Sequence, residues 1–347
     1  MAVDGRCPSS EERRASYWND EHLPGLAENN HFASRNHAGH QMESKQMRCP
    51  IVLACDRRYA MPLATTLRSI VETDRSGDPF EFHVLVDGVS ERIRKRILDS
   101  LPHGSASIRW IEVNLEMFRH FSTIGYISKV TYARFLIPRI FPETVPKVLY
   151  LDSDILVLDD LQALWTTDLE GNVLGAVLDG LDSQLKNQTV RLPVPRVQNY
   201  FNAGVLLIDL HQWRKAKISE TALEYLKRYP GSPYSDQDAL NVACDGVWKS
   251  LPSRWNYLAY NAELDVSEFA GEYKPSIVHF TTWNKPWRPG VPNANAALYD
   301  SFRSHTRFAR NSMDKMESTL RIGWSRIKSF QDGRRGKSTR SEEVVDP

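Results

Sequence analysis

The sequence predicts an α/β fold built on a mostly parallel sheet that helices flank. Two observations lead to this prediction: short, almost wholly apolar runs, and their regular alternation with segments whose apolar residues recur at helical spacing. Apolar runs without polar alternation indicate strands that are buried on both faces, as in sheets covered by helices on both sides. Alternation of strand and helix along the chain is typical of such doubly wound sheets.

The pattern begins at residues 51–55, a short apolar run that ends at Asp56 and therefore predicts a buried strand. A helix is expected next, because Leu63, Leu67 and Ile70 recur at a spacing of three to four residues. The elements that follow have the same character: strands at 80–86 and 107–113, and helices at 90–101 and around 128–134.

A second series of elements follows from residue 147 onward. We predict strands at 147–151, 155–157, 173–178, 205–208 and 276–278, and helices at 210–229 and 236–241. Between two of these elements, residues 181–199 are polar and contain Pro193 and Pro195, which predicts a long loop. Long loops of this kind often close over a ligand, so we expect this segment to act as a lid.

Composition limits the classes of function. The 347 residues include 44 Lys and Arg against 43 Asp and Glu, so the net charge of +1 does not indicate nucleic-acid binding. The four cysteines show no zinc-site spacing, which suits a reducing compartment. Apolar runs of membrane-spanning length and the apolar core of a signal peptide are both absent from the sequence. We therefore expect a cytoplasmic protein.

The chain divides into three predicted regions: a polar, aperiodic tail at 1–47, a single main domain at 48–302, and a basic segment at 303–347. Between Arg303 and Arg340 there are 11 Lys and Arg against three acidic residues. This segment also carries apolar residues at helical spacing, namely Met313, Met316, Leu320, Trp324 and Ile327. A basic amphipathic helix predicts contact with an anionic membrane surface; the alternative is a helix packed on the main domain with a solvated tail.

Acidic residues and a histidine follow several of the predicted strands. Asp56, Asp152 with Asp154, Asp179 and His279 each stand at the carboxyl end of an apolar run. If these strands belong to one sheet, the five side chains meet at one edge, where open α/β sheets bind their ligands. Two carboxylates one residue apart suit Mg²⁺ or Mn²⁺ that carries substrate phosphates, although an Asp-x-Asp alone also fits a polar turn.

Six motifs in order resemble those of glycosyltransferase family 8, within it the bacterial lipopolysaccharide galactosyl- and glucosyltransferases. They are LACD (53–56), TYAR (131–134), YLDSD (150–154), FNAGVL (201–206), DQD (236–238), and HF followed by KPW (279–287). The resemblance implies the GT-A fold, a Rossmann-like sheet in one catalytic domain. It also implies a UDP-sugar donor, Mn²⁺ (or Mg²⁺) as the cofactor, a cell-envelope oligosaccharide or lipid-linked glycan as the acceptor, and retention of anomeric configuration.

The resemblance also assigns expected roles to individual residues. The metal would be bound by Asp152, Asp154 and His279, and the donor diphosphate by Lys285. The remaining donor contacts would come from Ala54 and Asp56 at the uracil, from Arg134 and Asp179 at the sugar hydroxyls, and from Asn202, Ala203 and Gly204 along the sugar face.

Asp236 and Gln237 are expected beside the anomeric carbon, and two mechanisms remain open there. The Gln237 carbonyl would steady the positive carbon during front-face attack by the acceptor, whereas Asp236 would be the nucleophile of a double displacement. Two alternatives to a transferase also remain: another metal-dependent enzyme, such as a nucleotidyltransferase or phosphohydrolase, and an inactive sugar-binding module. Asp236 and Gln237 could also simply belong to a helix cap.

The chain departs from the family pattern at two places. Arg57 and Arg58 follow the first-strand aspartate, where the family often has an acidic residue and then Asn. Residues 281–284 (Thr, Thr, Trp, Asn) replace the glycine often found between the metal-binding histidine and the lysine. Contacts to the ribose and the phosphates are therefore expected to differ from those of the family.

Overall fold

The computed structural model describes residues 50–121, 128–187, 197–259, 271, 274–288 and 293–311. The predicted tail at 1–47, the central part of the predicted lid and nearly all of the basic segment at 303–347 lie outside the described residues. Within the described part of the chain, no helix is both long enough and apolar enough to cross a bilayer.

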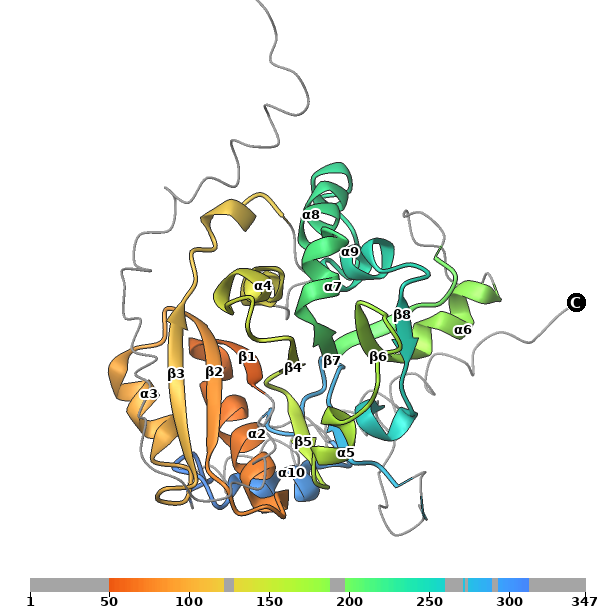
Figure 1. The fold of residues 1–347 in the computed structure, drawn as a ribbon. Coiled ribbons are helices and arrows are strands. Elements are labelled where there is room, and N and C mark those ends of the chain that lie inside the picture. The colour runs from red at the N-terminus through yellow and green to blue at the C-terminus, as the bar shows by residue number, and fades with distance from the viewer. Residues whose placement is uncertain are drawn as a thin grey trace, which may run out of the picture. The chain divides into compact units, whose positions relative to one another are not determined.

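A seven-stranded sheet forms the centre of the domain, in the order β3-β2-β1-β4-β7-β6-β8 (Figure 1). Its strands are β1 (Ile51–Asp56), β2 (Phe80–Asp87), β3 (Ala106–Glu112), β4 (Lys147–Leu151), β6 (Leu174–Leu178), β7 (Phe201–Asp209) and β8 (Trp248–Ser250). All neighbours are parallel except for β7, which is antiparallel to both β4 and β6. The mostly parallel sheet predicted from the apolar runs is therefore confirmed.

The direction of β7 decides which residues reach the ligand edge of the sheet. Leu151 at the end of β4 pairs with Val205, and Leu178 at the end of β6 pairs with Phe201. The beginning of β7 therefore lies beside the carboxyl ends of β4 and β6. As a result, residues 202–204 stand next to the Asp residues that follow those two strands.

A second, three-stranded sheet joins β5 (Ile155–Val157), β10 (Ile277–His279) and β9 (Tyr257–Leu258) in the order β5-β10-β9. The condition that the strands belong to one sheet is therefore not met for His279, which lies on β10 of the second sheet. It still reaches the same place, because β10 pairs antiparallel with β5 and sets His279 opposite Ile155, the residue after Asp154.

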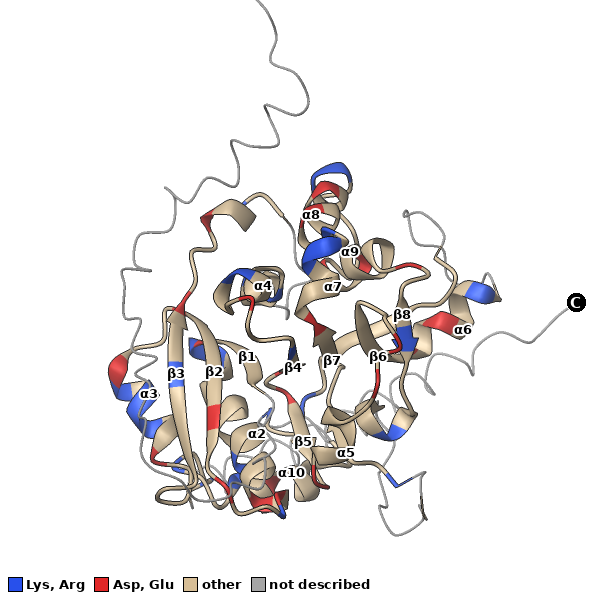
Figure 2. Cartoon of the chain, in the orientation of Figure 1, with Lys and Arg blue, Asp and Glu red and all other residues tan. Residues whose placement is uncertain are grey.

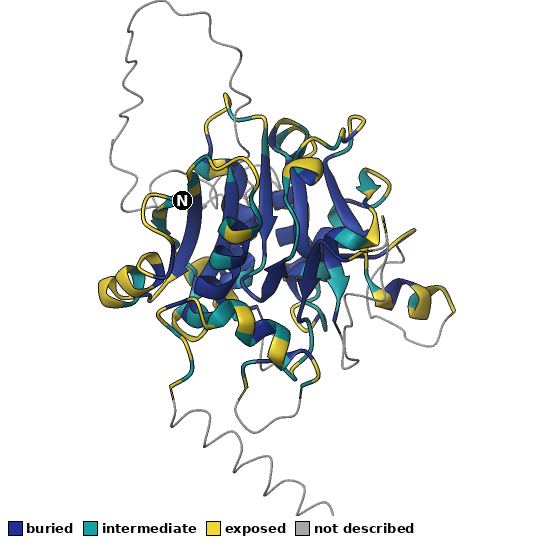
Figure 3. Ribbon diagram, turned by 90° about the horizontal axis from the view of Figure 1, so that it is seen from below, coloured by how far each residue is buried: buried dark blue, intermediate teal, exposed yellow. Residues whose placement is uncertain are grey.

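Helices cover the large sheet and bury it. They are α2 (Ala60–Thr73), α3 (Glu91–Leu98), α4 (Ile137–Ile140), α5 (Gln162–Trp165), α6 (Gly180–Lys186), α7 (Leu210–Lys215), α8 (Ile218–Arg228), α9 (Asp236–Ala243) and α10 (Ala296–Arg303). Figure 3 shows buried strands in the middle and helices with exposed outer faces around them. Figure 2 shows that charged residues lie mainly on helices and loops, whereas the strands are mostly uncharged. Leu63, Leu67 and Ile70 of α2 pack against the sheet, as their spacing predicted.

Three local predictions differ from the structure. Residues 210–229 form two helices rather than one, because Lys217 adopts a left-handed backbone (φ 54°) between α7 and α8. The predicted loop at 181–199 begins as the helix α6, which the Asp179 side chain caps by accepting from the Leu181 N–H. The expected helix around 128–134 is a 3-10 helix, Lys129–Leu136.

Candidate active site

The turn that carries the two aspartates is fixed from three sides. The Asp152 N–H donates to the Gly204 carbonyl (2.8 Å), which continues the pairing of β4 with β7. The Ser153 hydroxyl donates to the Ala54 carbonyl at the end of β1 (2.7 Å). From α2, the Thr66 hydroxyl contacts the carbonyls of Ser153 (3.0 Å) and Ile155 (2.8 Å). The carboxylates therefore project from a rigid turn rather than from a mobile loop.

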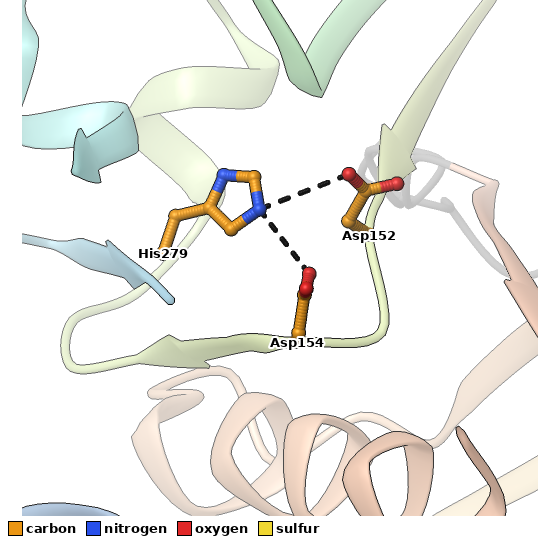
Figure 4. A group of neighbouring side chains, drawn as sticks. All are labelled: Asp152, Asp154 and His279. Carbon is orange, nitrogen blue, oxygen red and sulfur yellow. Dashed lines mark ion pairs between the residues drawn. The ribbon is translucent and has the colours of Figure 1, made fainter. Parts of the chain in front are cut away.

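Asp152, Asp154 and His279 form a group with metal-site geometry (Figure 4). One potential ligand atom from each residue lies within 4.8 Å of the others. His279 Nε2 lies 3.2 Å from Asp154 Oδ1 and 3.8 Å from Asp152 Oδ2. Two carboxylates and one imidazole suit Mn²⁺, which accepts oxygen and nitrogen ligands. The donor set therefore fits the cofactor that the sequence predicts.

The second nitrogen of the His279 ring contacts a residue that the sequence did not indicate. Nδ1 lies 3.0 Å from Oδ1 of Asn256, whose side chain is buried. Asn256 Nδ2 donates to Asn202 Oδ1 (2.8 Å), and Asn202 Nδ2 donates to Asp179 Oδ2 (2.9 Å). A continuous hydrogen-bond chain thus connects the metal group to the other end of the site. An N–H on Nδ1 leaves the Nε2 lone pair for a metal.

Lys285 stands behind the metal group and is also buried. Its Nζ lies 2.7 Å from Asp154 Oδ2 and donates to the carbonyl of Phe280. Burial alone would raise the pKa of Asp154, but the Lys285 charge and the neighbouring His279 ring outweigh burial and hold this pKa below the ordinary value for aspartate. Asp154 is thus kept as a carboxylate, the form that binds metal.

Gly204 makes the closest backbone approach to this group. A methyl group at its Cα would lie 2.1 Å from His279 Cε1 and 2.9 Å from Asp152 Oδ2. Real carbon contacts are never so short, so any larger residue would displace the histidine or the carboxylate. The resemblance placed Gly204 along the sugar face for close backbone approach, and in the structure the side chains that it approaches are His279 and Asp152.

Arg134 is buried at the centre of the site. Its Nη2 donates to Asp152 Oδ1 (2.9 Å) and Thr131 Oγ1 (2.8 Å), and its Nη1 donates to the Ala203 carbonyl (2.6 Å). Its Nε donates to the Thr131 carbonyl (3.0 Å) and lies 3.2 Å from Asp236 Oδ2. Within the described part of the chain, these bonds use four of the five guanidinium hydrogens, which leaves one for a ligand.

Asp236 and Gln237 occupy different surroundings although they are adjacent. Asp236 is buried against Arg134, and burial raises its pKa more than the Arg134 charge lowers it. Gln237 Oε1 accepts from the Ala203 N–H (3.0 Å), and Nε2 lies 3.4 Å from both Asp179 Oδ2 and Tyr200 Oη. Gln237 therefore belongs to the network around Asp179, and Asp236 to the network around Arg134.

A cavity of about 440 Å³ joins these groups, a volume typical of ligand pockets. Twelve of the 13 predicted site residues line it: Ala54, Arg134, Asp152, Asp154, Asp179, Asn202, Ala203, Gly204, Asp236, Gln237, His279 and Lys285. The exception is Asp56. Its carboxylate accepts from Ser128 Oγ (2.7 Å), from the backbone N–H groups of Arg58 and Tyr59, and from the Arg58 side chain. A base N–H would have to replace one of these donors.

The mostly parallel sheet, with an Asp-x-Asp turn and a histidine at its ligand edge, agrees with the GT-A fold expected from the sequence. Residues 50–289 match the model of the family described as Glycosyl transferase family 8. The chain belongs to this family, as its motifs predicted. The two alternatives left open by the sequence, another metal-dependent enzyme and an inactive module, are thereby disfavoured.

Relatives and solved structures agree with this assignment. General stress protein A of Bacillus subtilis is 28% identical over 74% of this chain and 94% of its own length. A lipopolysaccharide 1,2-glucosyltransferase of Escherichia coli K12 is 25% identical over 77% of this chain and 79% of its own length. The galactosyltransferase LgtC, solved with donor and acceptor sugar analogues, is 30% identical with a TM-score of 0.62, covering 77% of this chain and 99% of LgtC.

Several cavity residues were missed by the sequence reading, among them Tyr59, Ser128, Tyr150 and Trp283. A signal was present for Tyr150, because it lies on β4 two residues before Asp152, and side chains two residues apart on an extended chain point to the same side. Its hydroxyl donates to Asp152 Oδ1 (2.8 Å). Asn256 had no comparable signal, because only the pairing of β9 with β10 brings it beside His279.

Proposed function

We propose that this chain is a retaining glycosyltransferase that moves glucose or galactose from a UDP-sugar to a cell-envelope oligosaccharide or a lipid-linked glycan. The observation that carries the proposal is the group formed by Asp152, Asp154 and His279 beside Lys285, in the cavity of a family 8 chain. The E. coli relative, a glucosyltransferase of lipopolysaccharide, supports the class of acceptor. LgtC supports a donor sugar and an acceptor sugar in one site.

The leaving diphosphate would be held at the metal end of the cavity. Asp152, Asp154 and His279 would bind Mn²⁺ or Mg²⁺, which when bound supplies a Lewis acid for the departing phosphate oxygen. Lys285 would contribute a second positive charge at the same end of the cavity, because its Nζ lies 2.7 Å from Asp154 Oδ2. Interactions of this kind accelerate the reaction only as far as they strengthen while charge builds on the leaving group.

The sugar would lie toward Asp179, Asn202 and Gln237, which form one hydrogen-bonded group on the cavity wall. Here the contacts favour one of the two open mechanisms. Asp236 is buried against Arg134, so its carboxylate balances the positive charge of that guanidinium and is less available as a nucleophile. The Gln237 amide is neutral and has no such charge to balance. We infer front-face attack by the acceptor hydroxyl, with Gln237 as the group that steadies the anomeric carbon and the leaving phosphate as the base.

The place of action is part of the same proposal. A donor made from a nucleotide and the basic segment at 303–340 favour a cytoplasmic enzyme that acts peripherally at the inner face of the membrane. Truncation after Asn311, which keeps the contacts of Arg307 and Phe308 with the main domain, tests this assignment: co-sedimentation with anionic vesicles should be lost while UDP release persists. Full-length protein that never pellets with those vesicles at low salt would contradict it.

The direct test of the function is UDP release. The protein should release UDP from UDP-glucose or UDP-galactose when Mn²⁺ is present, and chelation by EDTA should abolish this release. Asp154→Asn should lose several orders of magnitude in turnover and still melt cooperatively, because Lys285 retains a hydrogen-bond partner. Proton NMR of the first product must show the anomeric configuration of the donor; an inverted linkage would refute retention. Full activity in EDTA would refute the metal assignment.

A further inference from the structure

Trp283 is the most exposed of the large hydrophobic side chains in the described part of the chain, at 55%. Single exposed hydrophobic residues are common on protein surfaces, so exposure alone carries no conclusion. The position of Trp283 is what distinguishes it, because the residue lines the cavity that contains the metal group. Leu98, Met117 and Val247, which are also exposed, do not line that cavity.

The indole is presented by a well-fixed loop. The Trp283 carbonyl accepts from the Lys285 N–H (3.0 Å) and from Arg288 Nη1 (3.0 Å), and the Arg288 guanidinium lies 5.9 Å from the ring centroid. The start of the loop is held by Phe280, which is buried and packs edge-on against Trp287. The backbone that carries the indole is therefore already ordered, and ordering it costs little when a ligand binds.

The loop runs from the interior of the site to its mouth. Lys285 is buried against Asp154, whereas Trp283, two residues earlier, is exposed. The charged part of a nucleotide-sugar therefore finds its charged partners at the inner end, whereas the uncharged indole offers a phosphate at most one N–H donor. An aromatic face does suit the C–H face of a pyranose ring, because that face is apolar while the ring edge carries the hydroxyls.

We propose that Trp283 forms the acceptor subsite by stacking on the C–H face of a pyranose ring of the incoming glycan. This proposal rests on the transferase function proposed above and names the side of the cavity that receives the acceptor. The loop 281–284 is also where the chain departs from its family pattern. Trp283 is accordingly a determinant of acceptor choice in this chain rather than a general feature of the family.

Other occupants of an exposed tryptophan are a lipid surface and a protein partner. Trp283 lines the cavity of the metal group together with Thr281 and Thr282, a position that a glycan acceptor must reach in order to react. Their threonine side chains add hydroxyl groups beside the aromatic ring, and a mixture of aromatic and hydroxyl groups is typical of polar small-molecule sites. The concave setting therefore favours a sugar.

Saturation-transfer NMR on the full chain with UDP and Mn²⁺ tests the subsite. Methyl β-D-glucopyranoside and methyl β-D-galactopyranoside serve as probes. Wild type should transfer saturation to the C–H protons on one face of at least one probe. Trp283→Ala should abolish this transfer, Trp283→Phe should keep part of it, and Leu98→Ala, on the outer face of α3, should match wild type.

Kinetics with the same variants separate the acceptor side from the donor side. Trp283→Ala should raise the KM for the pyranoside acceptor about tenfold, as expected for loss of one aromatic stacking contact. UDP release without acceptor should fall less than transfer to the acceptor, because the Asp152, Asp154, His279 and Lys285 side chains remain in place. The fold of each variant is checked by its melting temperature.

Three results would overturn the subsite. They are no saturation transfer to either probe in wild type, transfer that persists in Trp283→Ala, and a Trp283→Ala variant that loses donor hydrolysis as strongly as transfer. If Trp283→Ala loses binding to anionic vesicles but still shows saturation transfer to the pyranosides, the indole belongs to a membrane contact and the subsite is refuted. Failure of the proposed function gives a different result. Wild type would then release no UDP, whereas saturation transfer to the pyranosides would still show whether a sugar contacts Trp283.

Discussion

Asn256 Oδ1 lies 3.0 Å from Nδ1 of His279, on the side of the ring opposite the two aspartates. The imidazole can donate a proton to this oxygen, which fixes its orientation and keeps Nε2 unprotonated toward Asp152 and Asp154. Metal-binding histidines usually have such a partner, and its loss typically costs 10–100-fold in metal affinity. The contact therefore makes Asn256 a positioning residue for the metal site.

We expect Asn256→Ala to weaken Mn²⁺ binding by about 10–100-fold, because the His279 ring loses its fixed tautomer and orientation. Mn²⁺ titration followed by electron paramagnetic resonance measures this without reference to activity. Asn256→Asp keeps an oxygen acceptor for the imidazole and should bind Mn²⁺ more tightly than Asn256→Ala. Equal weakening in both variants would show that the effect comes from the fold around Asn256 rather than from the contact.

Gly204→Ala should remove metal binding while the sheet remains formed. The added methyl group would lie 2.1 Å from His279 Cε1, so the ring or the Asp152 carboxylate must move away. Isothermal titration with Mn²⁺ and far-ultraviolet circular dichroism together report both properties. Gly231→Ala is the matched control, since a methyl group there meets no atom within 4 Å. Unchanged Mn²⁺ affinity in Gly204→Ala would refute the close approach.

The contacts of Asp236 and Gln237 predict that no glycosyl-enzyme accumulates. Wild type that is quenched during turnover should show no added hexose on Asp236 by peptide mass spectrometry, because that carboxylate is buried against Arg134. Gln237→Ala should lower kcat by about 10²-fold, the scale for losing one group that stabilises transition-state charge. A hexose found on Asp236 at a kinetically competent rate would instead establish double displacement.

His83 on β2 should make the stability of the protein depend on pH. Burial lowers the pKa of His83 more than the Glu81 carboxylate raises it, and its Nδ1 is shielded from solvent without a hydrogen-bond partner in the described structure. The unfolded chain then binds the proton more readily, so the free energy of unfolding falls as the pH drops below the ordinary histidine pKa of about 6.5.

Urea unfolding at several pH values between about 5 and 7.5 measures this dependence, since the histidine pKa lies in that window. His83→Gln should reduce the slope, because the titrating group is gone. His103→Gln, at an exposed position, should leave the slope as in wild type. A wild-type slope that is unchanged in His83→Gln would show that other groups govern the acid sensitivity.

The sequence predicted those parts of the site that depend on local order. Asp152 and Asp154 directly follow a buried strand, so the apolar run placed them correctly at the sheet edge. The position of His279 was predicted, but through the wrong sheet, because the pairing of β10 with β5 is not visible in either strand alone. The contact of Asn256 with His279 and the bond from Ser128 to Asp56 were beyond prediction, since they join segments distant in sequence.

The pairing of Leu178 with Phe201 bears on how this site can diversify. The chain leaves the sheet at Leu178 and re-enters it directly alongside, at the mouth of the cavity, so the length of the intervening segment is independent of the strand register. Doubling the length of such a segment adds only about 0.6 kcal/mol of closure entropy. Evolution can therefore lengthen this segment while the strands that hold Asp152 and Gly204 keep their alignment.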